Sequence, residues 1–257
     1  MTRRQIIVPV AALRAAPRAD AGLDNECLWG ETFIIDHSEN GFAFGRLDHD
    51  GCEGWVEMSC LGGLPAATAT VQVPMSHVTS TPDIKSPGLF TLSVGSRISG
   101  ETTVNGVVNG VVNGVMKIVI DGGVGFLPAR HVRPEGEIAT DWVAVAESLV
   151  GAPYKWGGRS AFGLDCSALV QVALAAAGIK VPRDSGPQHA IGAPVLGIDD
   201  LRRGDLVFWK GHVGIMQNGH DLLHANAHHM AVACEPLALA SDRIARIAGP
   251  ITALRRL

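Results

Sequence analysis

The stretch from Tyr154 to Val172, YKWGGRSAFGLDCSALVQV, constrains this chain more than any other part of it. A glycine-containing turn and a short polar run lead to Cys166, and the small and apolar residues after it predict a helix. A cysteine at a helix N-terminus lies beside unpaired N–H groups and the positive end of the helix dipole, and both favour the thiolate. The alternative interpretation of a lone cysteine is a small buried hydrophobic side chain.

Two histidines further along the chain favour the nucleophile. The segment after residue 204 shows β-rich runs on either side of a hairpin signal at Asn218-Gly219. The expected strands are Asp205–Trp209, His212–Gln217 and Leu222–Asn226. His212 then lies on the outgoing strand and His224 on the returning one. A cysteine nucleophile, a histidine base and a third group that orients the base are the minimum set for acyl transfer through a thioester.

A metal site is the competing interpretation, because the same segment also holds His220, His228 and His229. Zinc sites that use cysteine take it in closely spaced pairs. The chain has no CxxC pair, and Cys166 has no cysteine neighbour. We therefore expect no metal and no other cofactor.

Residues from about 138 to 257 resemble the NlpC/P60 family of cysteine peptidases. The matching pieces are GAPYKWGGRSAFGLDCSALVQ, VPRDSGPQ, LRRGDLVFWKGHVGIM and LLHANAHHM. The resemblance implies a papain-like α+β core in which Cys166 attacks the scissile carbonyl. It also implies that His212 transfers the proton and that His224 fixes the ring of His212. One departure is Ala168, where the family usually has glycine.

In the subgroup with SH3-like domains ahead of the peptidase, the resemblance implies cleavage after γ-D-glutamate in peptidoglycan stem peptides with a free N-terminal L-Ala. Asp165 and Ser167 match positions that bind this ammonium, and Ser185 matches a further hydroxyl. A short pocket of this kind would close the non-prime side and make the enzyme a dipeptidyl-peptidase. The Tyr154 hydroxyl and the backbone N–H of Cys166 are the expected oxyanion donors. The alternative role for Asp165 and Ser167 is helix capping.

Residues 1–66 resemble a bacterial SH3-type barrel, through a Gly-Glu dipeptide before a strand and the motif DG-x-x-GWV. The expected strands are Ile6–Val10, Glu31–Ile35, Gly41–Leu47 and Gly54–Met58. The resemblance implies that this barrel adds an acid and a tyrosine to the substrate pocket. Glu31 corresponds to the acid. Either Trp55 or Cys52 replaces the usual tyrosine.

Residues 67–135 repeat the plan, since DGGVGFLPARHV parallels DGCEGWVEMSCL, and predict a second barrel. The insertion at 104–115, VNGVVNGVVNGV, has no counterpart in the first copy and predicts a longer hairpin or loop without a function. The predicted fold is therefore multi-domain: two small all-β SH3-like barrels, then an α+β papain-like domain over residues 136–257.

Within the last domain, Asp141 is the expected N-cap of a helix that runs to about Val150. A second helix is expected over 167–177 and a final strand near Arg246–Ile251. The exceptional size of tryptophan favours core positions for Trp156 and Trp209.

A net charge of −4 over 257 residues gives no reason to expect nucleic acid or an anionic membrane as a partner. The five cysteines are odd in number and scattered, which argues against a disulfide framework and favours a reducing compartment. The apolar stretch Gln5–Leu13 contains Pro9 and lacks a convincing cleavage site, so it reads as a strand and not as a signal peptide. We expect a cytoplasmic protein.

The leading interpretation is a peptidase that recycles murein peptides. The alternatives are an endopeptidase or amidase that acts on intact cell wall, and a non-catalytic protein that binds the wall. The complete set of Cys166, His212 and His224 argues against the last of these. The sequence leaves the diamino acid and the oligomeric state open.

Overall fold

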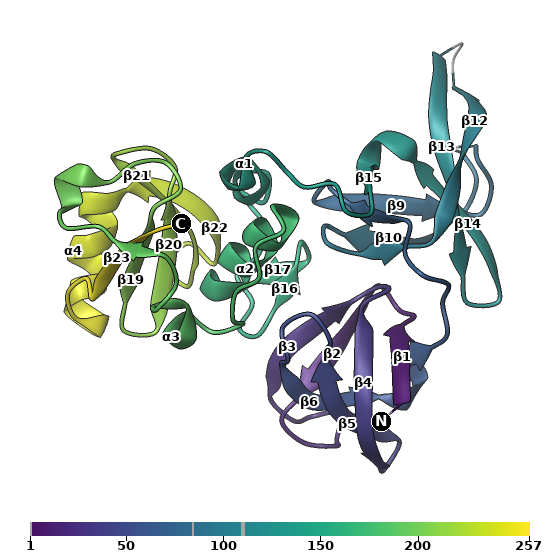
Figure 1. Cartoon of the computed structure of the whole chain (residues 1–257), viewed down its shortest axis with the longest axis horizontal. Coiled ribbons are helices and arrows are strands. Elements are labelled where there is room, and N and C mark those ends of the chain that lie inside the picture. The colour runs from purple at the N-terminus through teal and green to yellow at the C-terminus, as the bar shows by residue number, and fades with distance from the viewer. Residues whose placement is uncertain (1, 84, 109–110) are drawn as a thin grey trace. The chain divides into compact units, whose positions relative to one another are not determined.

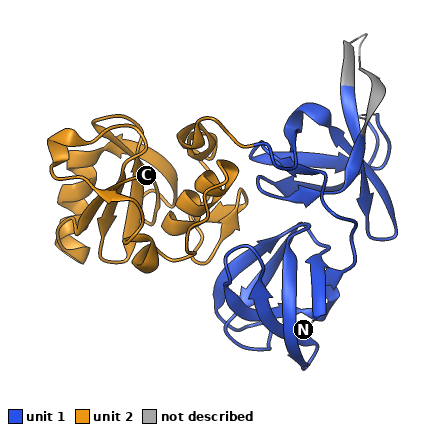
Figure 2. Cartoon of the chain, in the orientation of Figure 1, with its two compact units in different colours: residues 1–137 blue, residues 138–257 orange. Residues whose placement is uncertain are grey.

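The computed structural model describes residues 2–83, 85–108 and 111–257. The chain divides into two compact units, residues 1–137 and residues 138–257 (Figure 2). Within the described ranges, strands predominate in unit 1, whereas unit 2 combines strands with the four α-helices (Figure 1).

The first half of unit 1 is an antiparallel sheet in the order β3-β2-β6-β5-β4-β1-β7. Its strands are β1 (Thr2–Ile6), β2 (Val10–Arg14), β3 (Leu23–Leu28), β4 (Thr32–Glu39), β5 (Phe42–Leu47), β6 (Glu53–Glu57) and β7 (Leu61–Gly62). Alternate side chains point inward, so Leu13, Phe33 and Val56 meet in one buried cluster. The predicted strand Ile6–Val10 is wrong: residues 7–9 form the corner between β1 and β2, where Pro9 has no N–H to give to a ladder.

The second half of unit 1 has a sheet in the order β10-β9-β14-β13-β12 and a smaller one in the order β11-β8-β15. Its strands are β8 (Ala69–Val71), β9 (Met75–Thr79), β10 (Gly88–Ser93), β11 (Arg97–Ile98), β12 (Gly100–Val108), β13 (Val111–Ile120), β14 (Gly123–Pro128) and β15 (Val132–Pro134). The predicted insertion at 104–115 lies where β12 pairs with β13, and Val108 pairs with Val111. Residues 109–110 of the insertion lie outside the described residues.

Trp29 ties the two halves of unit 1 together. Its side chain is buried in the hydrophobic core of the second half, where its ring stacks on Phe90 with centroids 5.0 Å apart. The N–H of Arg97 donates to the Trp29 carbonyl at 2.8 Å. Gly30 follows with φ of +75°, and a Cβ there would lie 1.8 Å from the Arg97 carbonyl oxygen, so only glycine fits.

Unit 2 is built on an antiparallel sheet in the order β18-β23-β19-β20-β21-β22. Its strands are β16 (Arg159–Ser160) and β17 (Gly163–Leu164), which pair separately, then β18 (Ala193–Pro194), β19 (Leu206–Trp209), β20 (His212–Met216), β21 (Asp221–Asn226), β22 (Ala231–Pro236) and β23 (Ala253–Arg256). The helices are α1 (Trp142–Glu147), α2 (Cys166–Ala176), α3 (Ser185–Gln188) and α4 (Leu237–Ala248). Helix α2 packs on β20 and β21, and α4 packs on β21 and β22.

Two of the predictions for unit 2 are confirmed and two are wrong. Helix α1 begins after Asp141, whose carboxylate accepts hydrogen bonds from two N–H groups of the first turn. Trp209 is buried as expected, but Trp156 is 76% exposed in the turn before β16, so the prediction of a core position is wrong for it. The predicted strand at Arg246–Ile251 is also wrong. Residues 246–248 are the end of α4, and Gly249 follows with φ of +86°. The strand comes later, as β23.

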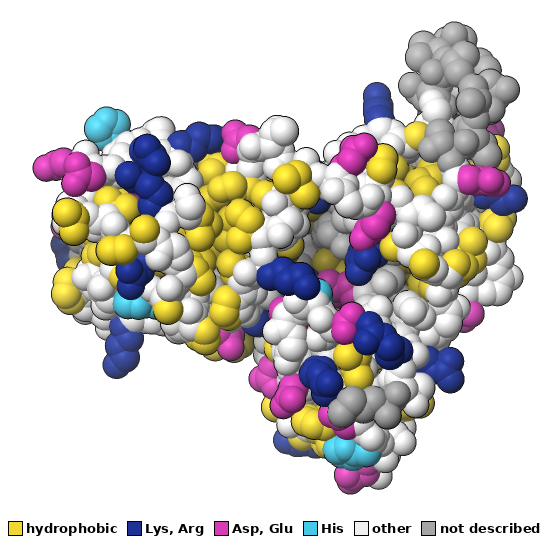
Figure 3. All heavy atoms as spheres, viewed as in Figure 1, with side chains coloured by type: hydrophobic (Ala, Val, Ile, Leu, Met, Phe, Trp, Pro, Cys, Tyr) yellow, Lys and Arg dark blue, Asp and Glu magenta, His cyan; other side chains and the backbone are white. Residues whose placement is uncertain are grey.

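On the face drawn in Figure 3, acidic and basic side chains are interspersed over both units, in keeping with the net charge of −4. Among the described residues, no helix has the length and apolar character needed to cross a membrane.

Candidate active site

Helix α2 begins at Cys166 because the residue before it is a strong N-cap. Oδ1 of Asp165 accepts the N–H of Ala168 at 2.9 Å. Every residue of the first turn is buried, and Cys166 itself is 6% exposed. A cysteine at this position lies beside the unpaired N–H groups of the first helical turn.

Asp165 also forms a buried ion pair that the sequence reasoning missed. Both guanidinium nitrogens of Arg183 bind its carboxylate, at 2.9 and 2.6 Å. Ser167 Oγ donates to Asp165 and accepts from Arg183, and the N–H of Gly157 donates to the second carboxylate oxygen. The helix-capping role is thus confirmed for Asp165. The signal for Arg183 was its place in PRDS, two residues before the predicted Ser185.

Three polar side chains follow a diagonal across one face of the sheet. His224 pairs with Ala233, so Glu235 lies two residues from it on the same face of β22. Ile215 pairs with Leu223, so position 214 lies opposite His224. His212, two residues before position 214, is therefore on the same face of the sheet. Nε2 of His212 lies 2.8 Å from Nδ1 of His224, and Nε2 of His224 lies 2.8 Å from Oε1 of Glu235.

Arg243, on α4, binds the last residue in this row of His212, His224 and Glu235. Its guanidinium binds both carboxylate oxygens of Glu235, one of them at 2.8 Å. Glu235 and Arg243 are functional candidates that the sequence reasoning missed, because it did not expect β22 or α4. The sequence signal for Glu235 is its spacing. A strand that returned after the turn following Asn226 would place it two residues beyond the partner of His224, on the same face.

Burial keeps both histidines neutral. It lowers the pKa of His212 to about 3, and the nearby His224 and Arg243 add to the effect. Burial likewise lowers the pKa of His224 to about 4, although the hydrogen bond to Glu235 acts in the opposite direction. Burial alone would raise the pKa of Glu235, but the hydrogen bonds from Arg243 and His224 outweigh it and lower this pKa to about 2. A carboxylate therefore faces two neutral imidazoles.

The thiol of Cys166 does not behave as its helix position predicts. Burial, with the negative charge of Asp165, raises the pKa of Cys166 to about 11. Hydrogen bonds from the N–H groups of Val213 and Ser167 stabilise the thiolate but do not compensate. The expectation of a favoured thiolate is thus wrong for the free protein, because desolvation outweighs the helix terminus. The Val213 contact places the thiol beside β20, next to the residue that follows His212.

Tyr154 lies close to the thiol. Burial raises the pKa of its hydroxyl to about 12, and the charges of Cys166 and Asp165 contribute. Its backbone N–H donates to the carbonyl of Met230 at 2.9 Å, which fixes the loop before β16 against the turn after β21. The hydroxyl is therefore protonated at neutral pH, as an oxyanion donor must be.

Ser185 opens α3 and is half-buried. In the same helix, the fully buried Gln188 donates to the carbonyls of Ser167 and Pro182 at 3.0 and 2.8 Å. Gln188 thereby ties the PRDS loop to the first turn of α2. Gln188 ends the segment VPRDSGPQ, which resembles the family, but no role was predicted for it.

The three candidates from residues 1–66 belong to unit 1. Glu31 is buried, and its Oε2 accepts the N–H of Leu28 at 2.7 Å. Trp55 is half-buried against Phe44, with ring centroids 5.2 Å apart. Cys52 is partly buried at the edge of the same core. Their predicted contact with substrate stays a prediction.

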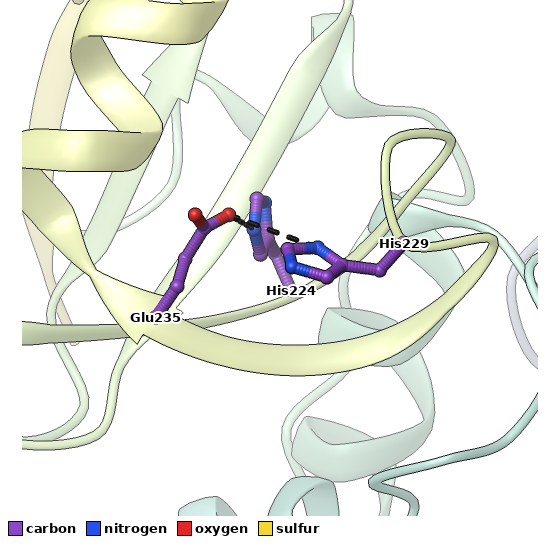
Figure 4. A group of neighbouring side chains, drawn as sticks. All are labelled: His224, His229 and Glu235. Atoms are coloured by element: carbon purple, nitrogen blue, oxygen red, sulfur yellow. Dashed lines mark hydrogen bonds and ion pairs between the residues drawn. The ribbon is translucent and has the colours of Figure 1, made fainter.

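His224, His229 and Glu235 also offer ligand atoms within 4.8 Å of one another (Figure 4). Glu235 already binds Arg243, and both ring nitrogens of His224 are in hydrogen bonds. A cation here would have to displace these contacts and would separate His224 from His212. In this structure the three side chains belong to a hydrogen-bonded network that ends in an ion pair with Arg243.

A buried cysteine at a helix start, packed on a sheet that carries a hydrogen-bonded histidine pair, defines a cysteine peptidase. The comparison with known families is more specific. The model of the NlpC/P60 family matches residues 151–241, and the model of the bacterial dipeptidyl-peptidase SH3 domain matches residues 13–61. The chain therefore carries an NlpC/P60 domain and, ahead of it, a bacterial dipeptidyl-peptidase SH3 domain.

Two relatives and one solved structure illustrate the similarity. Dipeptidyl-peptidase 6 of Lysinibacillus sphaericus is 28% identical over 86% of this chain and 86% of its own length. Gamma-D-glutamyl-L-lysine dipeptidyl-peptidase of Bacillus subtilis is 39% identical over 34% of this chain, and the match spans 32% of that protein. An NlpC/P60 family protein from Bacillus cereus has the same fold, with a TM-score of 0.81 over 99% of both chains at 19% identity.

Proposed function

We propose that this peptidase hydrolyses the bond between γ-D-glutamate and a diamino acid in peptidoglycan stem peptides that carry a free N-terminal L-Ala. The observation that carries the chemistry is the 2.8 Å contact between His212 and His224, together with the hydrogen bond from the N–H of Val213, the residue after His212, to the Cys166 thiol. The substrate is supported by the names of the two relatives, which describe dipeptidyl-peptidases and, in one, a γ-D-glutamyl-L-lysine bond.

The reaction starts from a neutral Cys166 thiol and a neutral His212 imidazole. Cys166 Sγ attacks the scissile carbonyl carbon while its proton passes to Nδ1 of His212, the ring nitrogen that His224 does not occupy. The tetrahedral oxyanion accepts from the backbone N–H of Cys166 and from the Tyr154 hydroxyl. His212 then gives the proton to the leaving amine, and a thioester remains. His212 next takes a proton from water, whose oxygen attacks the thioester carbon. The C–S bond breaks, L-Ala-γ-D-Glu leaves, and His212 returns the proton to Sγ of Cys166.

The amine pocket is built around Asp165, Ser167 and Ser185. Arg183 compensates the charge of Asp165 within the protein, so the pocket gains little net negative charge from that carboxylate. The two serine hydroxyls then act as acceptors for the ammonium group. For Glu31 and Trp55 of the SH3 domain, a role in substrate binding is supported by the resemblance alone.

The same proposal covers the domain organisation and the location. Residues 1–66 and 67–135 are two SH3-like barrels, in keeping with the two sets of strands in unit 1, and residues 136–257 are the peptidase domain. The protein acts in the cytoplasm on released peptides. This location is supported by the five cysteines of the chain, which are odd in number and scattered along the sequence.

The test compares L-Ala-γ-D-Glu-meso-diaminopimelate with its N-acetylated form, with products followed by mass spectrometry. We expect release of L-Ala-γ-D-Glu from the free amine only, and none from either peptide with Cys166→Ala. Equal cleavage of both peptides would show an open groove and an endopeptidase of intact wall. No cleavage of either would overturn the substrate. Persistent cleavage by Cys166→Ala would overturn the nucleophile.

A further inference from the structure

A histidine as the third catalytic residue leaves a problem that a carboxylate would not. A neutral imidazole has one N–H donor and one acceptor nitrogen. The contact between His212 Nε2 and His224 Nδ1 can therefore run in either direction. If His224 donates, the proton of His212 sits on Nδ1 and the base is blocked. Only the opposite direction leaves Nδ1 of His212 free to accept the proton of the thiol.

Glu235 removes this ambiguity. An ionised carboxylate only accepts hydrogen bonds, so Nε2 of His224 must carry its N–H toward Oε1 of Glu235 at 2.8 Å. The neutral ring of His224 then has a lone pair on Nδ1. His212 must donate from Nε2, which leaves its Nδ1 unprotonated. One carboxylate at the end of the row thus fixes the tautomers of both histidines.

We propose, building on the function proposed above for Cys166, His212 and His224, that Glu235 is a positioning residue that sets the tautomer of His212 through His224. Arg243 holds it in place from α4 by binding both carboxylate oxygens. The row of contacts crosses β20, β21 and β22 on one face, so the sheet register fixes its geometry.

The charges around the row determine what its loss would do. His212 becomes positively charged when it takes the thiol proton, and Glu235 stabilises that charge through His224. Arg243 opposes it, and His229 lies 3.9 Å from Glu235 at the same carboxylate. Without the carboxylate, the Arg243 cation would act on the histidines uncompensated. Both effects of losing Glu235, on tautomer and on charge, slow the chemical step and leave substrate contacts intact.

The first test is kinetic. Glu235→Gln keeps the size of the side chain, but its amide can donate or accept toward His224 and so permits both tautomers. We expect kcat to fall about 100-fold with KM nearly unchanged. A fall of that size is typical when general-base catalysis is impaired. The matched control is Glu147→Gln, which breaks a Glu–Arg pair with Arg203 elsewhere in the same unit. A kcat for Glu235→Gln equal to that of the control would overturn the inference.

The second test needs no substrate. The ¹⁵N shifts of the imidazole nitrogens report which of them carries the proton. We expect His212 in the wild type to be protonated at Nε2 and unprotonated at Nδ1, and to become a mixture in Glu235→Gln. A proton on Nδ1 of His212 in the wild type would overturn the inference even if the peptide is cleaved as proposed. The expected shifts would support it even if that peptide is not the substrate.

A double-mutant cycle separates positioning from stability. Asparagine in place of His224 can turn its own carbonyl toward His212, so it needs no second residue to choose a direction. Glu235→Gln should therefore cost kcat much less in a His224→Asn background than in the wild type. Equal costs in the two backgrounds would mean that Glu235 does not act through His224, and would overturn the inference.

Discussion

Arg183 binds Asp165 through two guanidinium nitrogens, and both side chains are almost fully buried. Asp165 caps the helix that begins with the nucleophile, so this ion pair fixes the residue immediately before Cys166. The guanidinium also donates to the carbonyl of Gly158 at 3.2 Å, in the turn before β16. The pair therefore joins the glycine turn, the helix start and the PRDS loop around one buried charge.

Removal of Arg183 should cost much more stability than removal of an exposed arginine. Arg183→Met leaves the Asp165 carboxylate buried without its counter-ion, and breaking a buried pair from one side typically costs about 3 kcal/mol or more. Arg203→Met breaks two ion pairs, with Asp141 and Glu147, in which Arg203 is 38% exposed, and about 1 kcal/mol or less is expected for each. Urea unfolding of the two variants measures the difference. Similar losses for both would show that water reaches Asp165.

The reactivity of Cys166 toward a neutral alkylating agent should rise with pH across the whole stable range. Its pKa is raised to about 11, so the thiolate fraction at pH 7 is smaller than that of a free thiol and keeps growing above pH 9. Iodoacetamide labelling from pH 6 to pH 10, with mass spectrometry of the Cys166 peptide and glutathione as reference, measures this. A labelling rate that is flat from pH 6 upward would instead reveal a resting thiolate–imidazolium pair.

Stability should fall as the pH drops below about 6.5. The pKa values of His212 and His224 are lowered to about 3 and about 4, so an unfolded chain binds protons that the folded one does not. Each such proton contributes a slope of about 1.4 kcal/mol per pH unit, and the loss continues until the folded pKa values are reached. In His224→Asn one proton disappears, so its free energy of unfolding should change less steeply between pH 6.5 and 4.5. Parallel curves for the two proteins would contradict the lowered pKa of His224.

The sequence was sufficient for the parts of the site that have local signals. Cys166 stands at a helix start with a capping residue before it, and the strands around Asn218-Gly219 follow from hairpin chemistry, so the histidine pair could be placed. Glu235 and Arg243 could not, because their role depends on the register of β22 and on the packing of α4. Long-range pairing of this kind has no local pattern.

The raised pKa of the thiol shows the same limit in energetic terms. The helix position of Cys166 is visible in the sequence, whereas the depth of its burial is set by β20 and the surrounding loops. Trp156 shows the reverse case. We expected it in the core, but it lies in the turn just before Gly157 and Gly158, which lead into β16, and backbone geometry decides its exposure there. Tertiary context overrides residue preference at both positions.

Ala168 stands where the family usually has glycine, and it is fully buried in the first turn of α2. Glycine at an internal helix position costs about 1 kcal/mol relative to alanine, so Ala168→Gly should lower the free energy of unfolding by about that amount. Its N–H would still donate to Asp165, so we expect kcat/KM to stay within twofold. The matched control is Ala173→Gly, also fully buried in α2 but two turns from the thiol. A rise of kcat/KM in Ala168→Gly alone would mean that the methyl group narrows the space beside Cys166.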